Sequence, residues 1–110
     1  MELKYNYWIG SFKNVDSVLK KSISQYTRNY SKVKIGITNK PERRKVQHSK
    51  SNLSWEKMVV LYQTKSINFI NKMEKNHITY QKLYVINQRN GGGGPNGKIG
   101  PYYLYVLLKK

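Results

Sequence analysis

Four stretches of the chain alternate apolar and polar residues, and this period of two predicts β-strands. In the first stretch, Tyr5, Tyr7 and Ile9 share one face. In the second, an apolar face carrying Val33 and Ile35 lies opposite a face with lysines and a glycine. The predicted strands cover residues 3–12, 31–38, 55–64 and 101–108.

Between these strands the apolar residues recur at steps of three and four, which is typical of amphipathic helices. This spacing predicts a helix over residues 15–30 and a second over residues 67–80, with Ser66 as its N-cap. A shorter helix begins at Pro41 and ends near residue 51, because proline suits the first helical position. Residues 83–86 form either a short strand or an extension of the preceding helix, and residues 91–100 are a glycine-rich loop.

The order β-α-β-α-β-α-loop-β predicts an α+β fold with a small, mostly antiparallel sheet flanked by helices. A chain of 110 residues is the length of one compact domain, so residues 1–110 are expected to form a single unit. A hydrophobic content of 38% favours a folded domain over a disordered tail. The chain has 0 Cys, which excludes disulfides, thiolate metal sites and a cysteine nucleophile.

The charge of the chain favours an anionic partner. It has 21 Lys and Arg against 5 Asp and Glu, a net charge of +16. A field of this sign attracts polyanions, and nucleic acid is the first expectation, ahead of a ribosomal or anionic-membrane partner. The many lysines and asparagines and the absence of alanine suggest an AT-rich genome, such as that of a phage or large virus. No apolar run is long enough for a signal peptide or membrane span, so we expect an intracellular protein without membrane contact, in the host cytoplasm or nucleus if it is viral.

The short helix carries the first candidate chemistry. Arg44 and His48 are four residues apart, so both side chains point to one helix face. The preceding strand contains Gly36, where the missing side chain allows another backbone or a phosphate to approach closely. A guanidinium can bind two phosphate oxygens, and an imidazole can transfer a proton. The alternative is a basic helix that merely faces solvent.

Glu74 is the second candidate, because it lies on the apolar stripe of the predicted helix over residues 67–80. A carboxylate on a buried stripe is costly unless a cation meets it. Either a lysine or a divalent metal could provide that cation, and Mg²⁺ needs only one or two protein carboxylates. His77 is expected to be structural or exposed, since two histidines without cysteine or an acidic cluster do not favour a zinc site.

These residues together resemble the GIY-YIG endonuclease family over residues 32–80. The resemblance rests on the run Lys-Ile-Gly-Ile-Thr around Gly36, on Arg44 eight residues later, on His48 one turn further and on Glu74. Lys34 stands where the second motif of the family usually has tyrosine, as in a variant branch.

The tyrosine of the first motif is less well defined by the resemblance. Tyr7 fits the pattern best, Tyr5 is the alternative, and Tyr103 or Tyr105 on the last strand are more distant alternatives. With Tyr7, the helix over residues 15–30 would be an insertion between two strands that normally form a hairpin.

The resemblance implies a one-metal DNA endonuclease. Glu74 would hold Mg²⁺ or Mn²⁺, and Tyr7, made more acidic by Lys34, would deprotonate the attacking water. Arg44 would stabilise the transition state, and His48 would relay the proton or orient the tyrosine. The remaining expected DNA contacts are Gly36, Lys40, Arg43 and Lys45.

The implied partner is double-stranded or branched DNA, together with a targeting protein or a second copy of the chain, and no small-molecule cofactor. A non-catalytic nucleic-acid-binding protein on the same fold is the main alternative, and a ribosome-associated protein is a third.

Overall fold

Seven elements alternate along the chain in the predicted order. The computed structural model describes residues 1–87 and 99–110, so most of the predicted loop over residues 91–100 lies outside the described residues. The strands are β1 (Glu2–Trp8), β2 (Lys32–Thr38), β3 (Lys57–Thr64) and β4 (Tyr102–Lys109). The helices are α1 (Phe12–Asn29), α2 (Pro41–Ser49) and α3 (Ile67–Tyr80).

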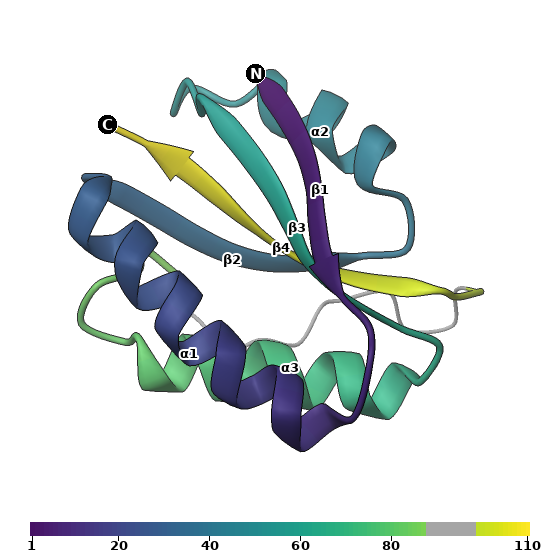
Figure 1. Ribbon diagram of the computed structural model, residues 1–110. Helices are drawn as coiled ribbons and strands as arrows, with labels where there is room; N and C mark the ends of the chain where they lie inside the picture. Colours follow the sequence, from purple (N-terminus) through teal and green to yellow (C-terminus); the bar gives the residue numbers. More distant parts are fainter. Residues whose placement is uncertain (88–98) are drawn as a thin grey trace.

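The four strands form one mixed sheet in the order β1-β3-β4-β2 (Figure 1). β4 lies in the interior of the sheet and pairs antiparallel with both β2 and β3, whereas β1 pairs parallel with β3. The structure is therefore an α+β domain whose sheet is mostly antiparallel, as predicted. With Tyr7 as the tyrosine of the first motif, the resemblance implied that the first strand and residues 31–38 are neighbours. They are not: β1 and β2 lie at opposite edges, and the C-terminal strand β4 is the neighbour of β2.

The two faces of the sheet are covered differently (Figure 1). Helices α1 and α3 lie together on one face and bury the larger apolar cluster, which includes Leu19, Ile35, Ile70 and Val106. Helix α2 lies on the other face, next to a smaller cluster. That smaller cluster consists of Trp55, Met58, Val60, Tyr105 and Leu107. The alternation predicted for β2 is confirmed, because Val33, Ile35 and Ile37 all point into the larger cluster.

Local capping explains where the helices begin. The Ser11 hydroxyl accepts a hydrogen bond from the Asn14 amide, so α1 begins at Phe12 and β1 ends earlier than its apolar pattern predicts. The predicted N-cap of α3 is confirmed, since the Ser66 hydroxyl accepts from the Phe69 amide. Pro41 occupies the first turn of α2 as predicted.

The segment after α3 covers the outer edge of β2. Residues 81–84 form turns, so they are neither the strand nor the regular helix extension that the sequence left open. The Ile86 amide then donates to the Val33 carbonyl, and the Asn87 side chain bonds both the amide and the carbonyl of Ile35. These contacts satisfy edge groups of β2 that another strand could otherwise pair with. Within the described part of the chain, no helix combines the length and apolar character that crossing a membrane requires.

Candidate active site

Helix α2 directs Arg44 and His48 toward the same atom on β4. The His48 Nε2 lies 2.8 Å from the Tyr105 phenol oxygen, and the Arg44 guanidinium lies close enough to the same phenol to lower its pKa. The prediction that these two side chains share one face of the helix is therefore confirmed, and the alternative of a helix that merely faces solvent does not hold for them. Both side chains are half-buried.

Gly36 allows this arrangement because it has no side chain. It pairs directly with Tyr105 in the antiparallel register of β2 and β4. A Cβ atom at Gly36 would overlap the end of the Tyr105 ring, including its hydroxyl. The close approach predicted at this glycine is real, but the group that approaches is a tyrosine ring rather than a backbone or a phosphate.

Glu74 reaches the same region from the other side of the sheet. It lies on α3 and is buried, with 7% of its surface exposed, as the apolar pattern predicted. The Tyr105 phenol extends from the interior strand β4 over the edge strand β2, against which α3 packs. Glu74 is near enough that its charge raises the pKa of Tyr105. Charged side chains on α2 and on α3 thus both influence the pKa of the Tyr105 phenol.

The environment sets the protonation states of this pair at neutral pH. Burial, helped by the nearby positive charges of Lys34 and Arg44, lowers the pKa of His48 from 6.5 to about 4. Burial raises the pKa of Tyr105 to about 12; Arg44 opposes this shift and Glu74 adds to it. The imidazole is therefore neutral and the phenol protonated, and in the tautomer with the proton on Nδ1 the phenol O–H donates to the His48 Nε2.

Tyr7 has different neighbours. Its ring packs edge-on against Tyr103 with 5.8 Å between ring centroids, and against Tyr5 with 6.5 Å. It lies on β1, at the sheet edge opposite β2. The tyrosine that joins Arg44 and His48 is Tyr105, which the sequence offered only as a distant alternative. Its signal was present in the alternation of Tyr103 and Tyr105 on the last strand, but their pairing with Gly36 depends on a strand order that alternation does not reveal.

The other positively charged residues predicted for the site differ in how near they lie to Tyr105 and His48 and in how exposed they are. Lys34 lies close enough to His48 to lower its pKa, so it belongs to the same cluster. Lys40 and Arg43 are exposed at the start of α2, and Lys45 is half-buried on it. These three side chains are available to solvent beside the cluster, but they do not form part of its hydrogen-bonded core.

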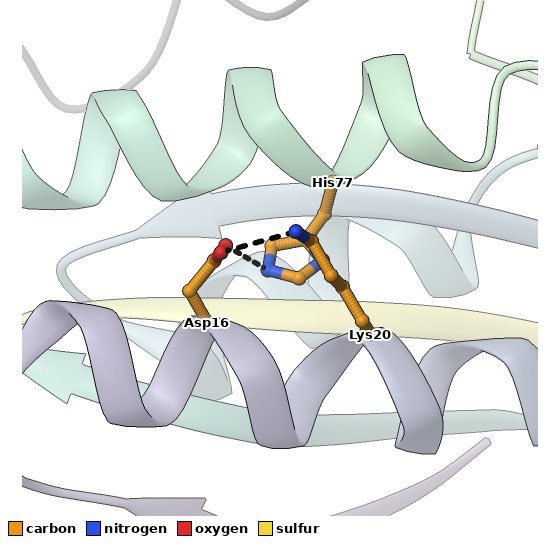
Figure 2. A network of polar contacts seen from close by, with 3 residues as sticks. All are labelled: Asp16, Lys20 and His77. Carbon is orange, nitrogen blue, oxygen red and sulfur yellow. Dashed lines mark ion pairs between the residues drawn. The ribbon is translucent and has the colours of Figure 1, made fainter.

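The second histidine belongs to a separate network between α1 and α3 (Figure 2). The His77 side chain is fully buried, and its Nε2 lies 2.9 Å from an Asp16 carboxylate oxygen. Lys20, one turn along α1, lies 3.5 Å from the other oxygen of Asp16. In Figure 2 the three side chains converge in the space between the two helices. The structural role expected for His77 fits this position, because the pair ties α3 to α1.

A metal ion could be held here only with help from its substrate. Among residues 1–87 and 99–110 there is no group of three or more His, Asp or Glu side chains able to hold one. Mg²⁺, however, commonly binds through one or two carboxylates and completes its shell with water and phosphate oxygens. Glu74 fits that type of site, and it does not fit a cage made entirely of protein ligands.

Comparisons of the chain with protein-family models, with curated proteins and with solved structures found no match.

Proposed function

We propose that this protein is a metal-dependent DNA endonuclease of the GIY-YIG type, with Tyr105 rather than Tyr7 as the tyrosine of its site. The observation that carries the proposal is the phenol of Tyr105, which is hydrogen-bonded to His48 and lies within electrostatic reach of Arg44 and Glu74. Three residues that resemble the family motifs, two on α2 and one on α3, therefore lie around one phenol. The net charge of +16 supports a phosphate backbone as the partner.

In this proposal Tyr105 and His48 form a proton relay. A phenol with a pKa of about 12 is too weak an acid to be ionised at neutral pH, so it cannot act as a free phenolate. It can take a proton from the attacking water while it passes its own proton to His48. This step requires a neutral imidazole, and the pKa of about 4 provides one. The phenol gains one proton and loses one, so it stays neutral, and the proton taken from water ends on His48 as an imidazolium.

Arg44 and Glu74 take the remaining roles. The guanidinium already lies at the phenol oxygen, where it would stabilise negative charge on the phosphate in the transition state. Glu74 would be the protein ligand for Mg²⁺ or Mn²⁺, and a bound ion would supply Lewis-acid stabilisation of the phosphate and of the departing oxygen. Lys34 keeps His48 in its neutral form through charge repulsion.

The first test is nicking of a supercoiled plasmid with Mg²⁺. We expect strand breaks that EDTA abolishes. Glu74→Gln should lower the rate by at least about a hundredfold, because losing a principal electrostatic contact costs on the order of 3 kcal/mol. Glu56→Gln is the matched control, since Glu56 is an exposed carboxylate outside the site, and it should cut at the parent rate. Cutting by purified Glu74→Gln at the parent rate would contradict the proposal.

The second test compares two tyrosines. Tyr105→Phe keeps the ring over Gly36 and removes only the oxygen that His48 and Arg44 contact. We expect it to lower the cleavage rate by about a hundredfold, the effect of losing a general acid–base group. Tyr7→Phe should cause a much smaller loss in the same plasmid assay. If Tyr7→Phe lost more cleavage activity than Tyr105→Phe, Tyr7 rather than Tyr105 would be the base.

The second candidate function is a basic nucleic-acid-binding protein without catalysis. It is favoured by the burial of Tyr105, which is only 2% exposed and could serve to support the sheet. Such a protein would shift the mobility of DNA in a gel without breaking strands, at any Mg²⁺ concentration. The plasmid assay therefore separates the two functions.

A further inference from the structure

The face of the sheet that carries Tyr105 continues into three more tyrosine rings. Tyr103 is two residues before Tyr105 on β4 and therefore points to the same face. Tyr7 packs edge-on against Tyr103 at an interplanar angle of 78°, and Tyr5 packs edge-on against Tyr7 at 79°. We call Tyr103, Tyr7 and Tyr5 the tyrosine track. It leads from the site in the sheet interior to the outer strand β1.

The track is accessible and held in place. Tyr5 is 51% exposed and Tyr7 is 39% exposed. The Gln63 side-chain amide donates a hydrogen bond of 2.9 Å to the Tyr103 hydroxyl, which fixes that ring, and the ring-to-ring contacts restrict the other two. Contiguous exposed aromatic surface is unusual on a soluble domain and marks interaction sites. In this domain the exposed aromatic surface lies beside the cluster formed by Lys34, His48 and Tyr105.

Nucleic acid is the partner whose chemistry matches both the rings and the charge. Aromatic side chains on a sheet face stack on the bases of single strands, with little dependence on base identity. Bases inside a duplex are covered by their neighbours, so only unpaired bases can stack on the track. The phosphates of such a strand would meet the cations near α2, including Arg43, Arg44 and Lys45.

We propose that the tyrosine track binds unpaired bases, and that the strand presented to the site is single-stranded next to the linkage that is cut. Tyr103 and Tyr105 are two residues apart on a strand, roughly 7 Å, which is the rise of about two stacked nucleotides. The statement about cleavage rests on the proposed function. The statement about binding does not, because it concerns side chains outside the relay.

The experiment measures binding in EDTA, so that it is independent of cutting. The probes are a fluorescent oligothymidine of about 12 nucleotides and a duplex of the same length, followed by anisotropy at fixed salt. Tyr7→Ala should weaken binding of the oligothymidine at least about fivefold, the lower end of the range for losing one stacked base. Binding of the duplex should change less than about twofold.

Two further variants and one control sharpen the result. Tyr7→Phe keeps the ring and should restore most of the affinity for the oligothymidine, whereas Tyr7→Leu keeps apolar bulk without a planar ring and should not. Tyr84→Ala removes a tyrosine that is more exposed than Tyr7 from the turn after α3, and it should leave both affinities within about twofold of the parent. Thermal melting shows that each variant is folded.

Two results would overturn the proposal. Either Tyr7→Ala and Tyr5→Ala bind oligothymidine as the parent does, or they lose affinity for the single strand and the duplex equally. Dissociation of a dimer by Tyr7→Ala with unchanged oligothymidine binding would assign this face to a second copy of the chain, which also overturns it. Failure of plasmid nicking would leave the binding result standing, so the two proposals fail separately.

Discussion

The two faces of the sheet are built on different principles. The face under α1 and α3 is closed by apolar contacts, and residues such as Leu19 and Ile70 are fully buried there. The face under α2 is apolar only near Trp55 and Leu107. Toward β2 it holds Tyr105, two cations and a histidine, and toward β1 it holds exposed tyrosine rings.

This difference suits one side of the domain to stability, and under the proposed function the other side supplies the chemistry. Apolar burial is the dominant favourable contribution to folding, and one well-packed face supplies most of it. The shorter helix α2 covers little apolar surface, since Pro41 is its buried residue. Its position therefore serves to place Arg44 and His48 over the phenol.

The largest expected contrast comes from one substitution on each face. Ile70→Ala removes a fully buried side chain and should lower the free energy of unfolding by about 2–5 kcal/mol. Arg44→Ala should change it by about 1 kcal/mol or less, while it lowers plasmid nicking by at least about a hundredfold. Denaturant unfolding and the nicking assay measure the two effects. Equal effects of both variants on both measurements would mean that the faces are not divided in this way.

A smaller effect is expected at the contact between β2 and β4. Gly36→Ala places a methyl group where the Tyr105 ring lies, so the ring must move away from His48 and Arg44. Overpacking of this kind costs about 1–3 kcal/mol of stability, and nicking should fall together with it. The measurement is unfolding and nicking of the same preparation. If both were unchanged, the ring would not depend on this close approach.

The smallest effect is the dependence of stability on pH. His48 has a folded pKa of about 4 against an ordinary value of 6.5, so the unfolded chain takes up its proton first as the pH falls. Burial also lowers the pKa of His77, against the opposing charge of Asp16. Both shifts favour the folded state above pH 6.5 and lose that effect as the pH falls, for His48 as it falls toward about 4.

Melting temperatures between about pH 7.5 and pH 4.5 test this expectation. We expect the temperature to fall over this range, and His48→Gln should show a shallower fall because it lacks one of the two titrating groups. The chain has only 5 acidic residues, so carboxylate titration contributes less than in most proteins. A melting temperature that rises on acidification would contradict the burial of both histidines.

The local sequence pattern was sufficient to predict the helices and strands and part of the candidate site. The order of strands and helices, the Ser66 cap and Pro41 at the start of α2 are confirmed. The shared face of Arg44 and His48 and the burial of Glu74 are confirmed as well. Each of these depends on residues within one or two turns of the chain, where helix and strand periods apply directly.

The choice of tyrosine could not be made in the same way. The sequence places Tyr7 on the first strand and near the predicted second strand, but the sheet puts β4 beside β2 and moves β1 to the far edge. Any of several strands could satisfy the alternating pattern beside Gly36. Only the register of Gly36 with Tyr105 identifies the ring that His48 and Arg44 contact.

The sequence by itself determined an α+β chain of high positive charge, with a basic helix and one buried carboxylate. Tertiary structure alone decided which strands are neighbours, and through them that Arg44, His48 and Glu74 act on the phenol of Tyr105. The reason is that side-chain periodicity is a local property, whereas strand order depends on which apolar faces bury one another across the whole domain.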